Sequence, residues 1–253
     1  MAAVIETQGL AKSYGRFGAL HGLDLSMPQG SIFALVGASG AGKTTAIRVL
    51  LNILTPTRGR ASVLGVDSRS IGPGVLARIG YVSESQLMPP RLRVGQLFDF
   101  LRPCYRSWDR QLEQELRERL RLPAERRIQA LSHGMRLKMA LACALPFHPQ
   151  LLILDEPFSG LDALTRDEMI AVFLREPRET SILISSHELD EVERLATHVA
   201  FLDEGRLLFQ GMLEELRARA RVQYSDKGGT DGSGLSLRSI FVAMVSAARR
   251  GQA

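Results

Sequence analysis

The sequence feature that most constrains the fold is one glycine-rich run: Gly37, Ala38, Ser39, Gly40, Ala41, Gly42, Lys43 and Thr44. The run fits the pattern G-x-x-x-x-G-K-[ST] at every defined position. Its glycines let the backbone curl, so that successive N–H groups face one concavity, and a helix beginning there adds the positive end of its dipole. An apolar run, residues 31–36, precedes it, and an apolar helical segment, residues 45–54, follows it. This order predicts a buried strand, a phosphate-binding loop and a helix.

Two residues of this loop carry specific expectations. Lys43 is expected to reach the β- and γ-phosphates of a nucleotide, and Thr44 to ligate Mg²⁺ through its hydroxyl. Thr45, the next residue, completes the set predicted to contact the nucleotide. The alternative is an accidental glycine-rich turn, which the flanking strand, the flanking helix and the motifs downstream disfavour.

A pair of acids, Asp155 and Glu156, follows the buried apolar run 151–154. The carboxyl end of a buried strand directs such acids to the sheet edge where ligands bind. Asp155 is expected to hold Mg²⁺, through water, beside Thr44. Glu156 is expected to orient or deprotonate the attacking water as a general base. Standing alone, the pair would be better explained as two solvated acids that start a loop.

Strands alternating with helices along the chain predict an α/β fold. We expect a P-loop NTPase core with a mixed, largely parallel sheet flanked by helices, an N-terminal antiparallel β-subdomain, and an inserted helical lobe at about residues 90–140. A nucleotide-binding domain would span residues 1–220, a flexible glycine-rich linker 221–234, and a C-terminal helix or tail 235–253. Strands are expected at residues 4–7, 22–27, 31–36, 61–64, 79–82, 151–154, 181–185, 198–202 and 206–210, the last two forming a hairpin around Glu204–Gly205.

The composition restricts the classes of partner. The net charge is +5, but the arginines of the lobe alternate with glutamates, as in Glu113/Arg117 and Glu115/Arg119. Such i, i+4 pairs indicate a solvated helix face, so no nucleic-acid partner is expected. The two cysteines, Cys104 and Cys143, are too few for a disulfide framework or a zinc site and are expected to be buried free thiols in a reducing cytoplasm. We expect neither a signal peptide nor a membrane span.

Further motifs occur in a fixed order. Residues 131–135 read Leu-Ser-His-Gly-Met, which resembles the signature Leu-Ser-Gly-Gly-Gln of ATP-binding-cassette (ABC) subunits. Ser132 would begin a helix, so that its hydroxyl and the N–H of Gly134 form a second anion site. From about residue 4 to residue 216 the chain resembles the nucleotide-binding subunit of an ABC transporter. The other matching segments are Asp155–Glu156–Pro157, Ser159–Gly160–Leu161–Asp162, Ser185–Ser186–His187–Glu188 and Lys12–Ser13–Tyr14–Gly15.

This resemblance implies further roles and a partner. Two ATP molecules would be sandwiched in a head-to-tail dimer, where Ser132 and Gly134 meet the γ-phosphate bound on the opposite subunit. His187 would contact the γ-phosphate and the water, and Tyr14 would stack on adenine. The open alternatives are a simple helix cap for Ser132, a structural histidine for His187 and a buried core tyrosine for Tyr14.

Three positions depart from the family pattern. His133 and Met135 replace a glycine and the final glutamine of the signature, and Glu84 stands where the family has glutamine. Gln86 is an alternative for that position, but the register favours Glu84, which could ligate Mg²⁺ and touch the water. The Glu84 variant resembles subunits that pair with small export-type membrane proteins.

The implied function is that of an ATPase subunit that dimerises on ATP and powers transport through separate integral membrane permease subunits, as an exporter. The second subunit would be identical or related. The protein would be cytoplasmic and peripheral on the inner face of the cell membrane. A groove beside Glu84 would receive a permease helix, and the helical lobe near Leu87 to Phe100 would transmit the force. The alternative is a non-transport ABC ATPase, such as a cluster-assembly ATPase. Translation factors of this type carry two cassettes, repair ATPases carry a long coiled coil, and a kinase or GTPase would lack the signature.

Overall fold

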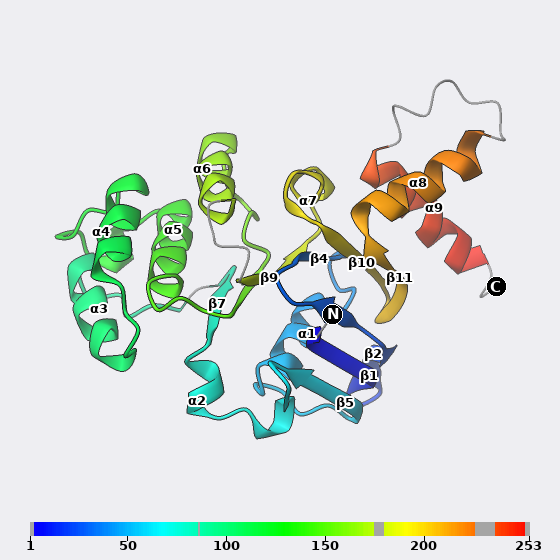
Figure 1. Ribbon diagram of the computed structural model, residues 1–253, viewed down its shortest axis with the longest axis horizontal. Coiled ribbons are helices and arrows are strands. Elements are labelled where there is room, and N and C mark those ends of the chain that lie inside the picture. Colours follow the sequence, from blue (N-terminus) through cyan, green and yellow to red (C-terminus); the bar gives the residue numbers. More distant parts are fainter. Residues whose placement is uncertain (1–2, 86, 175–179, 226–235, 251–253) are drawn as a thin grey trace. The chain divides into compact units, whose positions relative to one another are not determined.

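The computed structural model describes residues 3–85, 87–174, 180–225 and 236–250. The chain divides into two compact units: the first comprises residues 1–70 and 183–253, and the second comprises residues 71–182. Figure 1 shows the elements of both, and each unit is described by itself. In the part of the chain that is described, no helix is long and apolar enough to cross a membrane.

The first unit contains the expected N-terminal antiparallel sheet. Its strand order is β2-β1-β5-β6, and β3 also pairs with β1. Thr7 explains why the single strand expected at residues 22–27 is two strands. Its buried hydroxyl donates to Leu23 O (2.7 Å) and accepts from Leu25 N (2.8 Å), which holds the chain where β2 ends. The strands are β1 (Ala3–Tyr14), β2 (Phe17–Leu23), β3 (Ser26–Pro28), β5 (Arg58–Val63) and β6 (Val66–Asp67).

A second sheet in the same unit carries the glycine loop. Strand β4 (Ile32–Val36) pairs in parallel with β10 (His198–Asp203), and β10 pairs antiparallel with β11 (Arg206–Met212). The expected hairpin is confirmed: Glu204 and Gly205 both have positive φ, 45° and 73°, as a two-residue turn of the primed type requires. Strand β9 (Ser181–Ser186) starts in the second unit and ends in the first, and helices α1 (Lys43–Leu50) and α7 (Leu189–Leu195) complete this part.

Two helices close the first unit. Helix α8 (Leu213–Ser225) and helix α9 (Leu237–Arg250) lie beside β11 (Figure 1). Helix α9 buries Leu237 and Ile240 in an apolar cluster with Phe201, whose ring lies 5.1 Å from that of Phe241. The terminal helix therefore packs back onto the sheet. Residues 221–225, expected to belong to a linker, are instead the end of α8; the glycine-rich stretch 227–234 lies outside the described residues.

The second unit combines two parallel strands with the expected helical lobe. Strand β7 (Ile79–Ser83) pairs with β8 (Leu151–Asp155), which is buried along its whole length. A side chain at Gly80 would meet Leu152 and the carbonyl of Ala144, so glycine lets α5 pack close to β7. The helices are α2 (Pro73–Leu76), α3 (Val94–Leu101), α4 (Arg110–Arg119), α5 (His133–Ala144) and α6 (Ala163–Phe173), with short 3-10 turns at Arg102–Cys104 and Ile128–Ala130.

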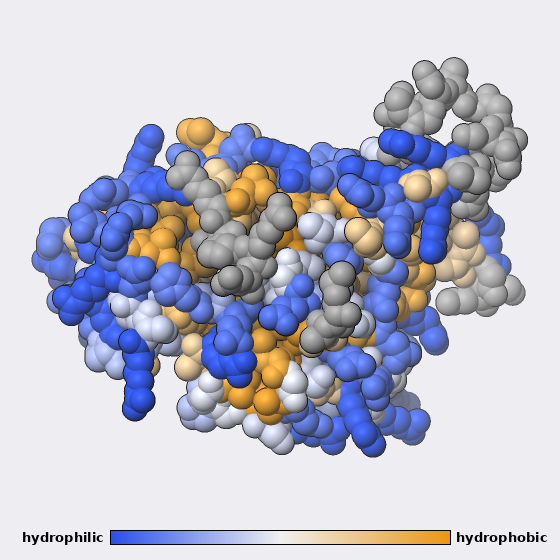
Figure 2. Space-filling view, viewed as in Figure 1, coloured by the Kyte–Doolittle hydropathy of each residue, from blue (hydrophilic) through white to orange (hydrophobic). Residues whose placement is uncertain are grey.

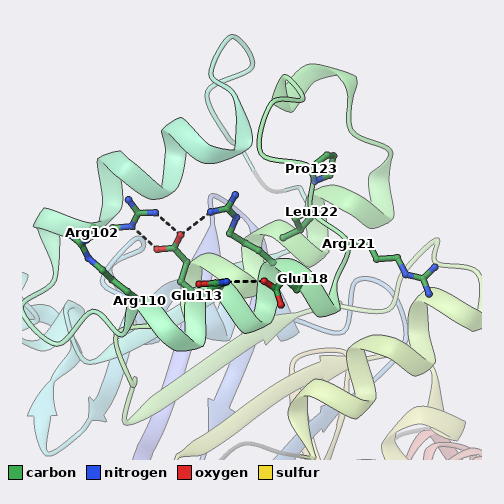
Figure 3. A pocket seen from close by; sticks show the side chains of 9 residues that line it. Arg102, Arg110, Glu113, Glu118, Arg121, Leu122 and Pro123 are labelled. Carbon is green, nitrogen blue, oxygen red and sulfur yellow. Dashed lines mark hydrogen bonds and ion pairs between the residues drawn. The ribbon is translucent and has the colours of Figure 1, made fainter.

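Glu113 corrects the expectation of a solvated arginine–glutamate face on α4. Its carboxylate is buried and accepts two hydrogen bonds from Arg102, 2.7 Å each (Figure 3). It also accepts one from Trp108 Nε1 (2.9 Å) and one from Arg117 (3.4 Å). Burial opposes ionisation of Glu113, but the hydrogen bonds from Arg102 and Trp108 outweigh it and lower its pKa. The expected pairing of Glu113 with Arg117 is present, but it lies in the interior of the lobe, where a charge requires partners.

The outer surface of the lobe is polar in other respects. Figure 2 shows mostly hydrophilic side chains around α3 and α4. Arg119, expected to pair with Glu115, donates to the carbonyl of Ala171 at 2.7 Å. The expectation of two buried thiols is wrong for Cys104, which is exposed; Cys143 is partly buried, and burial raises its pKa.

Candidate functional site

The glycine loop joins β4 to α1 in the order that the sequence predicts. Two of its glycines are required by the geometry. A Cβ at Gly37 would lie 2.3 Å from Leu202 O, and Gly42 has φ 104° with Ala19 O only 2.6 Å from where a Cβ would stand. Any larger residue would push the loop away from the neighbouring backbone, so the tight curl depends on glycine.

Lys43 lies across the mouth of this curl. Its side chain is buried, and Nζ donates to Gly37 O at 2.7 Å and to Ala38 O at 3.2 Å. Helix α1 starts at this lysine, has no side-chain cap among the described residues and has no acidic residue in its first turn. The cation and the positive end of the helix dipole therefore coincide, as an anion-binding loop requires.

Neighbouring segments fix the loop from two sides. Gly37 N donates to Ser186 O at the end of β9 (3.3 Å). From the hairpin turn, Gly205 N donates to Ala41 O (3.0 Å), and Gly205 O in turn accepts from His21 N (2.9 Å). This supporting role of Gly205 was not predicted, although the turn at Glu204–Gly205 was. His187 directly follows Ser186; its ring is half-exposed, with Nε2 3.7 Å from Glu188 Oε1.

Tyr14 lies at the end of β1 with its side chain exposed. The residue is 46% exposed, and the ammonium of Lys12 lies 5.3 Å from the centre of its ring. A buried core tyrosine, the competing interpretation, is therefore wrong. The exposed ring is available for stacking on a flat ligand.

In the second unit, the predicted carboxylates gather where β7 and β8 end. Asp155 is the last, buried residue of β8, and Glu84 N donates to its carbonyl oxygen at 3.0 Å. Glu156 follows with φ 52°, an unfavourable conformation for a residue with a side chain. The alternative of two freely solvated acids does not describe Asp155. Gln86, the other candidate for the position of Glu84, lies outside the described residues.

The signature segment begins α5 as expected. Ser132 is the N-cap, and its hydroxyl accepts from Met135 N at 3.2 Å, so the helix-cap interpretation describes it in this structure. Gly134 packs against the next helix, because a Cβ there would lie 3.2 Å from Thr165 Cγ2. That helix, α6, is capped by Asp162, whose pKa is lowered by the hydrogen bond from Thr165 N.

The donor set fits Mg²⁺ by its chemistry. Thr44, Asp155 and Glu84 offer only hydroxyl and carboxylate oxygens, which are the ligands that hard divalent cations prefer. The described residues contain no group of three or more His, Cys, Asp or Glu side chains arranged to hold a metal. In phosphate sites Mg²⁺ is typically held by one or two carboxylates together with phosphate oxygens and water, so such a group is not needed.

An open cleft of about 640 Å³ lies elsewhere, along α4 (Figure 3). Its lining includes Arg102, Arg110, Glu113 and Arg117. None of the predicted site residues lines it, so it is separate from the predicted chemistry of this unit.

Comparison with known proteins identifies a family. A model of the ABC transporter family matches residues 20–159. The ATP-binding protein YtrB of Bacillus subtilis is 32% identical over 216 residues, covering 85% of this chain and 74% of YtrB. The bacitracin transport ATP-binding protein BcrA of Bacillus licheniformis is 33% identical and covers 87% of this chain and 74% of its own. The daunorubicin/doxorubicin resistance ATP-binding protein DrrA of Streptomyces peucetius is 33% identical, and the match covers 85% of this chain and 67% of DrrA.

Solved structures share the fold. An ATP-binding subunit of an ABC transporter superposes with a TM-score of 0.81 at 24% identity, covering 96% of this chain and 99% of its own. A dimeric ATP-binding cassette in a post-hydrolysis state, bound to ADP and Pi, superposes with a TM-score of 0.72 at 21% identity. The match covers 83% of this chain and 98% of that cassette. These likenesses confirm the expected α/β architecture with its glycine loop and antiparallel N-terminal sheet.

Proposed function

The chain belongs to the ATP-binding proteins of ABC transporters and is an ATPase, and on that premise we propose that it powers export of a substrate through separate membrane subunits. The observation that carries the proposal is the glycine loop, in which the buried cation of Lys43 and the uncapped start of α1 face the same curl. That arrangement matches the charge and shape of a nucleotide's phosphates. The similarity to BcrA, a bacitracin transport protein, and DrrA, a daunorubicin/doxorubicin resistance protein, favours export over import.

Each predicted site residue has a role in this proposal. The glycine loop, with Thr45, holds the phosphates, and Tyr14 stacks on adenine. Mg²⁺, which neutralises phosphate charge when bound, has oxygen ligands in Thr44, Asp155 and Glu84. Glu156 accepts a proton from the attacking water, and His187 contacts the γ-phosphate and that water.

Completion of the site requires a second cassette, identical or related. The exposed turn at Ser132 and Gly134 would meet the γ-phosphate held by the partner cassette, so ATP closes a head-to-tail dimer and hydrolysis reopens it. The dimeric relative bound to ADP and Pi supports this arrangement by analogy of fold. A single chain is then expected to be a poor ATPase.

The membrane partner is expected to contact the lobe near Glu84. Leu87 is 99% exposed and Phe100 is 64% exposed, so both apolar side chains are available for contact with a partner. A permease helix docking there would hold the protein at the inner face of the cell membrane. No nucleic acid is part of this proposal.

Affinity purification from detergent-solubilised membranes tests the proposal. The wild-type chain should retain a multi-span membrane protein in a fixed ratio. A Leu87→Asp/Phe100→Asp variant should lose it, because two charges would replace the apolar contact. Ile53→Asp, a matched change at another exposed apolar residue, should retain it. Recovery of soluble assembly factors with no membrane protein would instead favour the cluster-assembly alternative.

A further inference from the structure

Ser159, four residues beyond Asp155, is held through its side chain and through its backbone carbonyl by two residues that depart from the family pattern. Its hydroxyl donates to Glu84 Oε1 at 2.8 Å. Its carbonyl oxygen lies 3.1 Å from His133 Nε2. A glycine at position 133, as in the signature that this segment resembles, would have no side chain to make the second contact.

The contact with the carbonyl shows which nitrogen of the His133 ring is the donor. A carbonyl oxygen only accepts hydrogen bonds, so Nε2 must carry the proton and donate. The ring also packs beside Gly160, since a Cβ on that glycine would lie 3.7 Å from His133 Cδ2. Gly160 has φ 68°, which glycine adopts without strain.

Other contacts fix the segment that follows Ser159. Leu161 packs against Gly134, because a Cβ on that glycine would lie 3.4 Å from Leu161 Cδ2. Asp162 is the N-cap of α6. On the other side, the Glu84 backbone is tied to Asp155 O. Segment 159–162 is therefore bonded both to the end of β7 and to the start of α5.

We propose that His133 and Glu84 are positioning residues that clamp Ser159 between them, so that segment 159–162 moves together with the turn at Ser132. This rests on the proposed function, because the turn at Ser132 is the part that would meet the partner's nucleotide. A displacement of the Glu84 segment, next to the expected permease contact, is transmitted through Ser159 to that turn. Two departures from the family pattern thus act as one mechanical link.

The first test uses the nucleotide-free protein and needs no ATPase. ¹⁵N NMR of the histidine rings should show the Nε2–H tautomer for His133, assigned by loss of its signals in His133→Gln. Ser159→Ala should keep that tautomer, because it keeps the carbonyl. A predominant Nδ1–H tautomer in the wild type would overturn the clamp.

The second test asks whether the two contacts act together. His133→Ala and Ser159→Ala should each lower the folded-to-unfolded ratio about fivefold, typical of one hydrogen bond. Because both contacts hold one residue, the double variant should lose clearly less than the product of the two single losses. Losses that simply multiply would show two independent contacts and overturn the proposal.

The third test separates positioning from nucleotide binding. His133→Ala should lower kcat about fivefold and leave KM for ATP within about twofold, because the glycine loop is untouched. His133→Gln, whose amide N–H can reach the carbonyl, should restore kcat. A raised KM with unchanged kcat would contradict the clamp. If the wild type had no ATPase activity, the proposed function would fail, while the NMR and double-variant results would still judge the clamp.

Discussion

Lys43 is the residue on which nucleotide binding depends most. Its buried ammonium is already held by two carbonyl oxygens of the loop, so it is positioned before any phosphate arrives. Lys43→Ala should reduce ATP affinity by tenfold or more, because an ion-to-phosphate hydrogen bond contributes about 1.5–3 kcal/mol. Isothermal titration calorimetry measures this directly. Arg48→Ala, which removes an exposed charge from the same helix, is the control and should bind normally; equal affinities in all three proteins would refute the role of the loop.

Tyr14 offers a test of base recognition. Its exposed ring should stack on adenine, so Tyr14→Ala should weaken ATP binding by roughly 1–3 kcal/mol, while Tyr14→Phe should keep most of the affinity. Phe17→Ala, at a more exposed aromatic on the next strand, is the matched control. Fluorescence titration with a labelled ATP analogue would measure the affinity of each variant. Loss of affinity in the Phe17 variant alone would place the base elsewhere.

Glu113 shows what sequence patterning misses at this scale. The i, i+4 spacing identified its partner Arg117. The burial of Glu113 depends instead on Arg102 and Trp108, which donate hydrogen bonds to its carboxylate in the folded lobe. Glu113→Gln should destabilise the protein by about 2–4 kcal/mol in urea unfolding, because it removes the buried charge that pairs with Arg102 and leaves only the exposed Asp99 as an acidic partner. Glu115→Gln, on the exposed face of α4, should cost under about 0.5 kcal/mol.

The pH dependence of the same contact has a definite sign. The folded-state pKa of Glu113 is lowered, so its contribution to stability is present above the unfolded pKa of about 4.3. That contribution is lost as the pH falls through the folded pKa. Unfolding curves between neutral and acidic pH should therefore fall less steeply for Glu113→Gln than for the wild type. Parallel curves would show that Glu113 has the same pKa in the folded and unfolded states, which would contradict the lowered pKa.

Among the elements, α9 has a defined attachment to the sheet. Arg249 donates from Nε and Nη2 to the carboxylate of Asp203, both at 3.0 Å, and that hydrogen bonding raises the arginine pKa. Asp203 immediately precedes the turn whose Gly205 supports Ala41 in the glycine loop. Arg249→Ala should therefore speed amide exchange in α9, measured by hydrogen–deuterium exchange with mass spectrometry. Arg250→Ala, its exposed neighbour, should not; unchanged exchange in both would show that the apolar contacts alone hold the helix.

Elements whose signals are local were predicted well. The strand–loop–helix around Lys43 and the hairpin at Glu204–Gly205 are encoded in a few adjacent residues, and the structure confirms both. The division of residues 17–28 into β2 and β3 was not predicted, because it depends on Thr7, far away in sequence. The bond from Ser159 to Glu84 was missed for the same reason. The roles of the site residues stay predictions.

In the proposed mechanism the whole molecule is incomplete, because one chain supplies only half of each ATPase site. The glycine loop and Tyr14 belong to the first unit, and Ser132 and Glu156 to the second. If each γ-phosphate is completed by the signature turn of another cassette, nucleotide and assembly must be linked. ATP should then favour the dimer, and hydrolysis should release it.

The most direct measurement is sedimentation velocity of the Glu156→Gln variant with ATP and Mg²⁺. This variant should keep nucleotide binding but lose turnover, because the amide cannot accept the proton from water. We predict a species of two chains with ATP and of one chain with ADP, and a single chain in both cases once Lys43→Ala is added. If Glu156→Gln hydrolyses ATP at the wild-type rate, the general-base role of Glu156 is contradicted. If it stays a single chain at saturating ATP, the ATP-linked dimer of two identical chains is contradicted.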